Sequence, residues 1–134
     1  MPPIRYTVIE IGGNFMMDYK VNYDNWLSSP YLNAEGLNEL RSIGNDDKEI
    51  EYAFGAELEF GTAGMRGIIG YGTNKMNIYT VRRATQGLAE LIKSKGYSAM
   101  KKGVAISYDT RNKSELFART AAGVLLYNDI KVYI

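Results

Sequence analysis

The stretch GVAISYDTRNKSELFARTAAGVLLYNDIKVYI, residues 103–134, decides the expected fold of this chain. It opens with GVAISYD, an apolar run that ends in a turn signal and lacks the polar alternation of a half-exposed strand. Such a run is typical of a strand that is covered on both faces. The closing segment, IKVYI, predicts another strand.

The segment between these two strands, SELFARTAAGVLLYND, predicts an amphipathic helix. Its apolar residues share one stripe at helical spacing: Phe117, Ala121, Val124 and Leu125. Ser114 is expected to cap the helix, because its short side chain can accept a hydrogen bond from a free backbone amide.

A second helix is predicted in IYTVRRATQGLAELIKSKG, residues 78–96, with Asn77 capping its start and Gly96 its end. The order strand, helix, strand, helix, strand is typical of a mostly parallel sheet with right-handed crossovers, so the sequence predicts an α/β fold. One stripe of this helix is expected to face the core: Ile78, Val81, Ala84, Leu88, Leu91 and Ile92.

Residues 17–58 predict a helical arm in front of the main α/β part, residues 59–134. Turn residues separate short apolar clusters between positions 23 and 54, so two or three short helices fit this segment. Asp46 or Asp47 is expected to cap a helix that runs through Tyr52 and Phe54.

Residues 1–16, MPPIRYTVIEIGGNFM, form an extension of doubtful origin. One explanation is a start codon assigned too early: Gly12-Gly13 can be encoded by GGAGGN, which would then be a ribosome-binding site upstream of the Met16 codon. The coding DNA tests this hypothesis, because any other codons there remove its basis. The other explanation is a short edge strand from Tyr6 to Ile11.

The composition allows one globular domain and excludes several chemistries. A chain of 134 residues has room for a single core. Its 16 basic and 15 acidic side chains leave a formal charge of +1 without runs of like charge, which argues against a nucleic-acid partner. The absence of cysteine and histidine excludes disulfides, Ser-His-Asp triads and the usual zinc sites.

The sequence also gives no sign of a membrane partner. No apolar run approaches the roughly 20 residues of a membrane-spanning helix, and the N-terminus lacks the basic region and apolar core of a signal peptide. Because the absence of cysteine fits a reducing compartment, we expect a cytoplasmic protein.

A glycine-rich turn supplies the first candidate binding residues. In EFGTAGMRGIIG, residues 59–70, four glycines surround Arg66. Glycines let backbone amides approach a ligand, and a guanidinium can hold a phosphate with two parallel hydrogen bonds. Thr62, Gly64 and Arg66 therefore predict an anion site. The alternative is a tight turn whose arginine pairs with a carboxylate, since the glycine spacing matches neither the dinucleotide fingerprint nor the lysine-bearing phosphate loop.

A second polar turn, YDTRN at residues 108–112, follows the predicted strand 103–109. Loops after strand C-termini converge on one edge of an α/β sheet, so Asp109 and Arg111 are expected near the same ligand. The alternative is purely local, because an Asp-x-Arg sequence can cap the next helix and form an ion pair within the turn.

Three stretches resemble a known family: LEFGTAGMRG at 58–67, GTNKMNIYTVRRATQGLAELI at 72–92 and GVAISYDTRNKSELFARTAAGVLL at 103–126. They are similar to the N-terminal part of the phosphoglucomutase/phosphomannomutase enzymes of the alpha-D-phosphohexomutase superfamily, above all to the phosphopentomutase-like subgroup. The resemblance begins near Tyr23. It implies that residues 59–134 are part of domain I, a three-layer α/β/α domain with a mostly parallel, mixed sheet.

The resemblance also implies a chemistry. Such isomerases move a phosphoryl group of a phosphosugar between O1 and O6 of a hexose, or O1 and O5 of a pentose. They act through a phosphoserine and a bisphosphorylated sugar, with Mg²⁺. Arg66 would be the candidate catalytic residue, as a phosphate contact beside the phosphoserine. Thr62 and Gly64 would shape its turn, and Asp109 and Arg111 would lie near the same substrate cleft.

Several motifs of that family are missing from this sequence. It has no Thr-Ala-Ser-His-Asn-Pro-like serine loop, no Asp-Gly-Asp-x-Asp loop for Mg²⁺, no Gly-Glu-x-Ser-Gly sugar loop and no C-terminal phosphate loop. Without the nucleophile we expect an inactive fragment, truncated in domain I and without metal ligands. An open sheet edge would favour self-association. The alternative is a stand-alone α/β domain that binds phosphosugars or other anions without catalysis.

Overall fold

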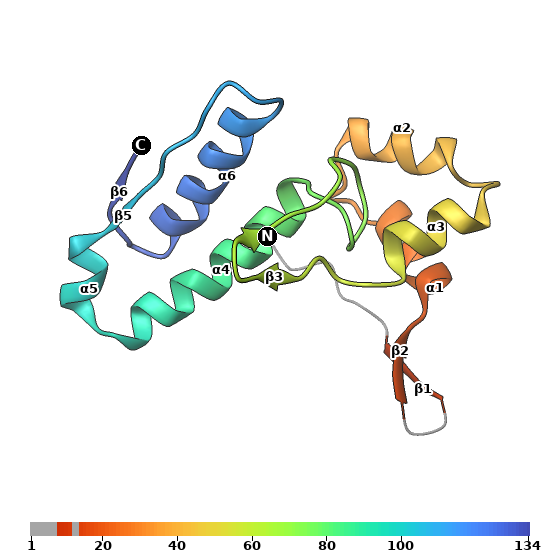
Figure 1. Cartoon of the computed structure of the whole chain (residues 1–134), viewed down its shortest axis with the longest axis horizontal. Helices are drawn as coiled ribbons and strands as arrows, with labels where there is room; N and C mark the ends of the chain where they lie inside the picture. Colours follow the sequence, from red (N-terminus) through yellow and green to blue (C-terminus); the bar gives the residue numbers. More distant parts are fainter. Residues whose placement is uncertain (1–7, 12–13) are drawn as a thin grey trace. The chain divides into compact units, whose positions relative to one another are not determined.

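A computed structural model describes residues 8–11 and 14–134 (Figure 1). The described chain forms two compact units, which divide between Asn77 and Ile78. The first unit holds β1 (Val8–Ile11), β2 (Asn14–Met17), α1 (Tyr19–Leu27), α2 (Ala34–Ser42), α3 (Asp47–Phe54), β3 (Phe60–Gly61) and β4 (Gly64–Met65). The second holds α4 (Ile78–Ser94), α5 (Tyr97–Lys102), β5 (Val104–Ala105), α6 (Ser114–Tyr127) and β6 (Val132–Tyr133).

The N-terminal strands β1 and β2 pair with each other as an antiparallel hairpin. Val8 stands opposite Met17, and Ile11 stands opposite Asn14. The edge strand predicted from Tyr6 to Ile11 is therefore present from Val8 onward, while its first two residues lie outside the described part of the chain.

Three short helices fill the segment that predicted two or three. A short polar side chain begins each of them by accepting a backbone N–H, as expected for an N-cap. Asp18 accepts from Val21 in α1, and Asn33 accepts from Gly36 in α2. In α3 the predicted Asp46 is the cap, at 3.1 Å from the Glu49 amide nitrogen.

Aromatic rings form the core of the first unit. Trp26 and Phe54 are 1% and 0% exposed, and their ring centroids lie 5.5 Å apart in an edge-to-face arrangement. Tyr23 packs edge-on against Phe54, and its hydroxyl donates to the Leu40 carbonyl at 2.7 Å. The helices α1, α2 and α3 are thus joined through one apolar cluster.

The strands of the described residues form three two-stranded sheets instead of one mostly parallel sheet. β3 and β4 are antiparallel, while β5 and β6 are parallel, with Val104 opposite Val132. The strand expected at the start of EFGTAGMRG turns back on itself after Gly61, because the next residues form a two-residue hairpin loop. The crossover from β5 through α6 to β6 is the part of the predicted sheet that the structure contains.

Helices α4 and α6 pack against each other in the second unit (Figure 1). The core there consists of Ala89, Leu125 and Ile130, all at most 1% exposed. Partly buried apolar residues pack around this core: Ile92, Met100, Val104, Ile106 and Val132. The short helix α5, which the sequence analysis did not anticipate, contributes Met100 to this cluster.

The predicted core stripe of α4 is wrong at Leu88 and Leu91. Val81 is buried and Ile92 packs against the core as predicted, but Leu88 and Leu91 are 42% and 56% exposed, and Thr85 and Ala89 are buried instead. The reason is that α4 turns its small residues inward, which lets another helix approach closely. The Thr85 hydroxyl bonds to the Val81 carbonyl at 2.7 Å, so its burial leaves no unsatisfied polar group.

The predicted stripe of α6 also misses buried small residues. Leu125 is buried as predicted, but Ala118 and Ala122 are the other buried residues, and Phe117 and Ala121 are only half-buried. Alanines at the contact again allow close packing. The predicted stripes therefore contain part of the buried face of each helix and miss its alanines, Ala89 on α4 and Ala118 and Ala122 on α6.

One predicted helix end is confirmed, and one predicted cap is wrong. After α4 ends at Ser94, Gly96 has a φ of +93° and donates its N–H to the Lys93 carbonyl, as a terminating glycine does. Ser114 is the first residue of α6 and not its cap. The cap position is Lys113, with a left-handed φ of 60°, and makes no side-chain capping bond.

Candidate functional site

The glycine-rich turn around Arg66 is a short antiparallel hairpin. Phe60 pairs with Met65 and Gly61 with Gly64, so Thr62 and Ala63 form its tip. Gly64 has a φ of +98°, a conformation that side chains other than glycine rarely adopt. The hairpin therefore depends on glycine at position 64, and it ends immediately before Arg66.

A second glycine lets the chain leave this hairpin past its own entry strand. A Cβ at position 67 would lie 2.6 Å from Cδ1 of Leu58, so a larger residue there would require the Leu58 side chain to move. Gly67 therefore allows the segment after Arg66 to run beside the segment before β3. The two feet of the hairpin, at Leu58 and at Ile68, come from these two segments.

Arg66 is exposed, as are Thr62 and Ala63 at the hairpin tip. Within residues 8–11 and 14–134, its guanidinium makes no ion pair or hydrogen bond, so the carboxylate pairing considered from the sequence does not occur there. A cation in this position can receive an anion without first breaking a contact with another described residue. Phosphate binding by Arg66 stays a prediction.

The second predicted turn, in the other unit, forms a local ion pair. Arg111 donates its Nε–H to Asp109 Oδ2 at 2.7 Å and its backbone N–H to Oδ1 at 3.0 Å. Both side chains are exposed, at 87% for Arg111 and 52% for Asp109. The pKa of Asp109 is lowered, chiefly by the Arg111 backbone N–H and then by the Arg111 side chain. This is the local arrangement that the sequence allowed as an alternative to ligand contact.

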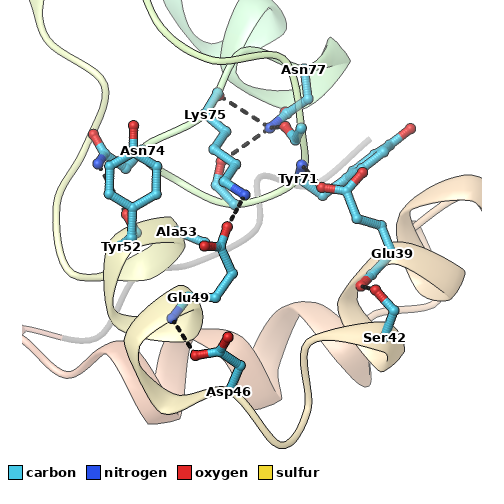
Figure 2. Close-up of polar contacts among 12 residues, drawn as sticks. Glu39, Ser42, Asp46, Glu49, Tyr52, Ala53, Tyr71, Asn74, Lys75 and Asn77 are labelled. Carbon is cyan, nitrogen blue, oxygen red and sulfur yellow. Dashed lines mark hydrogen bonds and ion pairs between the residues drawn. The ribbon is translucent and has the colours of Figure 1, made fainter.

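Residues 70–77, GYGTNKMN, form a loop with a polar interior, which we call the anchor loop. Asn77 donates its side-chain amide to the carbonyls of Gly70, Gly72 and Lys75, at 2.8, 3.0 and 3.2 Å. Figure 2 shows Lys75 reaching from this loop to Glu49 on α3, with an Nζ–Oε1 distance of 2.7 Å. The Lys75 side chain is 9% exposed and the Glu49 side chain 40%, so the ion pair joins a buried cation to a half-exposed carboxylate.

Sequence reasoning missed the role of the anchor loop and assigned Asn77 only to a helix start. A signal was available on α3. Glu49 lies four residues before Ala53, which is 0% exposed, so the two residues share a side of that helix, and the 40% exposed Glu49 side chain lies at the edge of its buried face. A carboxylate in this position can pair with a cation from a neighbouring loop, and Lys75 supplies that cation.

Neither a metal site nor a membrane helix is found in the described part of the chain. There, no three or more His, Cys, Asp or Glu side chains are grouped so that they could hold a metal ion. None of the helices described is both long enough and apolar enough to span a membrane.

A family model described as phosphoglucomutase/phosphomannomutase, alpha/beta/alpha domain I, matches residues 57–134. This match covers the Arg66 hairpin, the anchor loop and the whole second unit. It begins after α3, so the three N-terminal helices lie outside it.

Curated relatives carry names from the same group of enzymes. The chain is 36% identical over 109 residues to a phosphopentomutase from Homo sapiens, covering 77% of this chain and 18% of the relative. It is 47% identical over 76 residues to a probable phosphoribomutase from Schizosaccharomyces pombe, covering 57% and 13%. It is 39% identical over 84 residues to a phosphoglucomutase from Staphylococcus haemolyticus, covering 63% and 15%.

The chain spans less than a fifth of the length of these relatives. No solved structure matches it significantly. The family model nevertheless covers more than half of the chain, and the Arg66 hairpin with its glycines lies inside the matched range. On these grounds the chain belongs to the phosphoglucomutase/phosphomannomutase family, and its residues 57–134 match domain I of that family.

Proposed function

We propose that this chain is the N-terminal portion of a phosphosugar mutase. The complete enzyme would move a phosphoryl group between O1 and O6 of a hexose, or O1 and O5 of a pentose, through a phosphoserine and a bisphosphorylated sugar. Family membership supports this proposal. The observation that carries it for this chain is Arg66, an exposed guanidinium without an internal partner among the described residues, at the end of a glycine hairpin.

Arg66 would hold a phosphate by charge and by geometry. Its planar guanidinium can donate two parallel N–H bonds to two phosphate oxygens. Phosphoryl transfer spreads negative charge over several oxygens, so a fixed cation lowers the energy of the transition state as well as that of the bound substrate. Thr62 and Gly64 would serve this contact by shaping the hairpin. Asp109 and Arg111 would line the same cleft in the complete enzyme.

Members of this family use Mg²⁺, but the described residues do not fit such a site. They contain no group of three or more potential metal-ligating side chains, and the sequence has no Asp-Gly-Asp-x-Asp loop. No step proposed for these residues runs through the ion. The role assigned to this chain is to bind and orient phosphate.

Titration with glucose 1,6-bisphosphate tests the phosphate contact. We expect the Arg66 side-chain and hairpin amide signals of the ¹⁵N-labelled 134-residue chain to shift on binding. Arg66→Ala should weaken affinity at least tenfold, since a hydrogen bond to a charged group contributes about 1.5–3 kcal/mol. Arg66→Lys should retain only part of the affinity, because an ammonium group lacks the paired N–H donors of a guanidinium. Arg119→Ala is the control, since Arg119 is exposed in another unit and pairs with Glu115. Equal affinity of Arg66→Ala and the wild type would refute the contact.

An activity assay tests the proposal that the chain alone is inactive. The sequence lacks the serine loop that carries the phosphoryl group, and it contains no histidine for the His of that loop. With glucose 1-phosphate, glucose 1,6-bisphosphate and Mg²⁺, the chain should therefore form no glucose 6-phosphate. Turnover above the protein-free background would show that another nucleophile acts and would overturn this part of the proposal.

A further inference from the structure

The anchor loop bears both feet of the Arg66 hairpin. Before the hairpin, the Leu58 N–H donates to the Thr73 carbonyl at 2.9 Å. After it, the Met76 N–H donates to the Ile68 carbonyl at 2.8 Å, and within the anchor loop itself the Gly70 N–H donates to the Met76 carbonyl at 3.0 Å. The position of Arg66 therefore depends on the position of the anchor loop.

Helices outside the matched family range hold the anchor loop. Lys75 pairs with Glu49 of α3 at 2.7 Å. On the other side of the loop, the Tyr71 N–H donates to Oε1 of Glu39 on α2 at 2.9 Å, and the Tyr71 hydroxyl donates to Glu35 at 3.2 Å. Two helices thus bind the loop through carboxylates, one at each end (Figure 2).

The two loop residues in these contacts are buried, whereas the carboxylates that they contact are partly or largely exposed. Tyr71 and Lys75 are 4% and 7% exposed. A Cβ on Gly70 would lie 2.8 Å from Glu39 Oε1 and 2.9 Å from Lys75 Cδ, so a side chain there would displace these two side chains. Figure 2 shows the same arrangement, with Glu39 and Glu49 approaching the loop from different helices. An ion pair with one buried partner is screened less by solvent than a fully exposed pair, and it helps to fix the loop.

We infer that Glu39 and Glu49 are positioning residues for phosphate binding by Arg66, acting through Tyr71 and Lys75 of the anchor loop. The inference rests on the proposed function, because it takes phosphate as the ligand of Arg66. The helical arm then takes part in phosphate binding, although it lies outside the matched family range. The carboxylates touch no ligand themselves. They hold the loop to which both feet of the hairpin are hydrogen-bonded.

A matched pair of substitutions on α3 tests the inference. Glu49→Gln removes the carboxylate that pairs with buried Lys75. Asp47→Asn makes the same chemical change two residues earlier, where the pair with Lys20 is exposed at 62% and 66%. Inorganic phosphate is titrated into each ¹⁵N-labelled 134-residue chain, and the Arg66 Nε–H and the Gly64 and Gly67 amides are followed.

We expect Glu49→Gln to raise the dissociation constant about 3–10-fold, as substitutions along a coupled network do, and Asp47→Asn to leave it within about twofold. Hydrogen exchange at the Leu58, Gly70 and Met76 amides gives a second readout. It should accelerate in Glu49→Gln and not in Asp47→Asn. If both variants match the wild type in both readouts, the inference is overturned while the proposed function stands.

Two other experimental results have different consequences. If the wild type binds neither inorganic phosphate nor glucose 1,6-bisphosphate, the proposed function fails, and unchanged amide exchange would then overturn the positioning role as well. If Glu49→Gln does not fold, judged by Trp26 fluorescence, Glu39→Ala replaces it, because it removes the oxygen that accepts the Tyr71 N–H. Wild-type affinity and wild-type exchange in that variant would overturn the inference for α2.

Discussion

Replacing Gly72 by alanine should destabilise the first unit more than any other alanine substitution of a hairpin or loop glycine there. Gly72 has a φ of +132°, outside the range that alanine adopts without strain. A Cβ at this position would lie 2.5 Å from the Ala53 carbonyl oxygen and 2.9 Å from the Ala53 Cβ. The same carbonyl accepts the Asn74 N–H at 3.0 Å, so the clash falls on a backbone group that already joins the anchor loop to α3.

The size of the effect follows from two contributions. A non-glycine residue in a sparsely populated backbone region costs about 1–3 kcal/mol. Forcing an extra methyl group into a packed site costs about another 1–3 kcal/mol. We therefore expect Gly72→Ala to lower the free energy of unfolding of this unit by about 2–6 kcal/mol, a large share of the stability of a small domain.

Urea unfolding followed by Trp26 fluorescence measures this loss. Trp26 is the single tryptophan of the chain and is 1% exposed in the first unit, so it reports the unit that contains Gly72. Gly64→Ala is the matched control: its φ is +98°, but no atom lies within 4 Å of a Cβ there. It should show only the backbone contribution, about 1–3 kcal/mol. A Gly72→Ala variant as stable as Gly64→Ala would refute the steric argument.

Three further outcomes are expected. Asp46→Ala should lower the stability of the first unit by about 1 kcal/mol in the same assay, because α3 loses its N-cap acceptor, and Asp46→Asn should retain most of that stability. In the second unit, Leu125→Ala should cost about 2–5 kcal/mol by circular dichroism, against less than about 0.5 for the 60% exposed Leu126→Ala; equal losses would contradict the assigned core. Because the pKa of Asp109 is lowered from 3.8, its stabilising contribution should be complete above that value and be lost as pH falls through the lower folded pKa. A carbon-detected NMR titration should give a midpoint below 3.8, and Arg111→Gln should raise it only part of the way, since the Arg111 backbone N–H remains.

The helices of the N-terminal arm could be predicted from sequence because their signals are local. Asp46 caps α3 as expected, since an N-cap depends on a few neighbouring residues. Gly96 follows α4 with a positive φ for the same reason. The strands of the crossover, β5 and β6, were also predicted, from two apolar runs on either side of a helical pattern.

Contacts between distant segments could not be predicted in the same way. The inward faces of α4 and α6 are set by Ala89, Ala118 and Ala122, whose advantage is the close approach of another helix and not their own apolar area. Lys75 and Glu49 are 26 positions apart, and neither residue alone indicates that they pair. The exposure of Arg66 likewise depends on how the chain folds around it.

The parallel pairing of β5 and β6 bears on the order in which the second unit folds. Val104 and Val132 can meet only after the chain between them has closed a long loop, and this closure costs entropy before any strand hydrogen bond forms. α6, with 14 residues, shortens that span to about 21 Å of rigid helix at about 1.5 Å per residue. Folding should therefore begin in the helices, and β5 and β6 should pair afterwards. Their pairing should be the slowest contact of this unit to form and the first to open on heating.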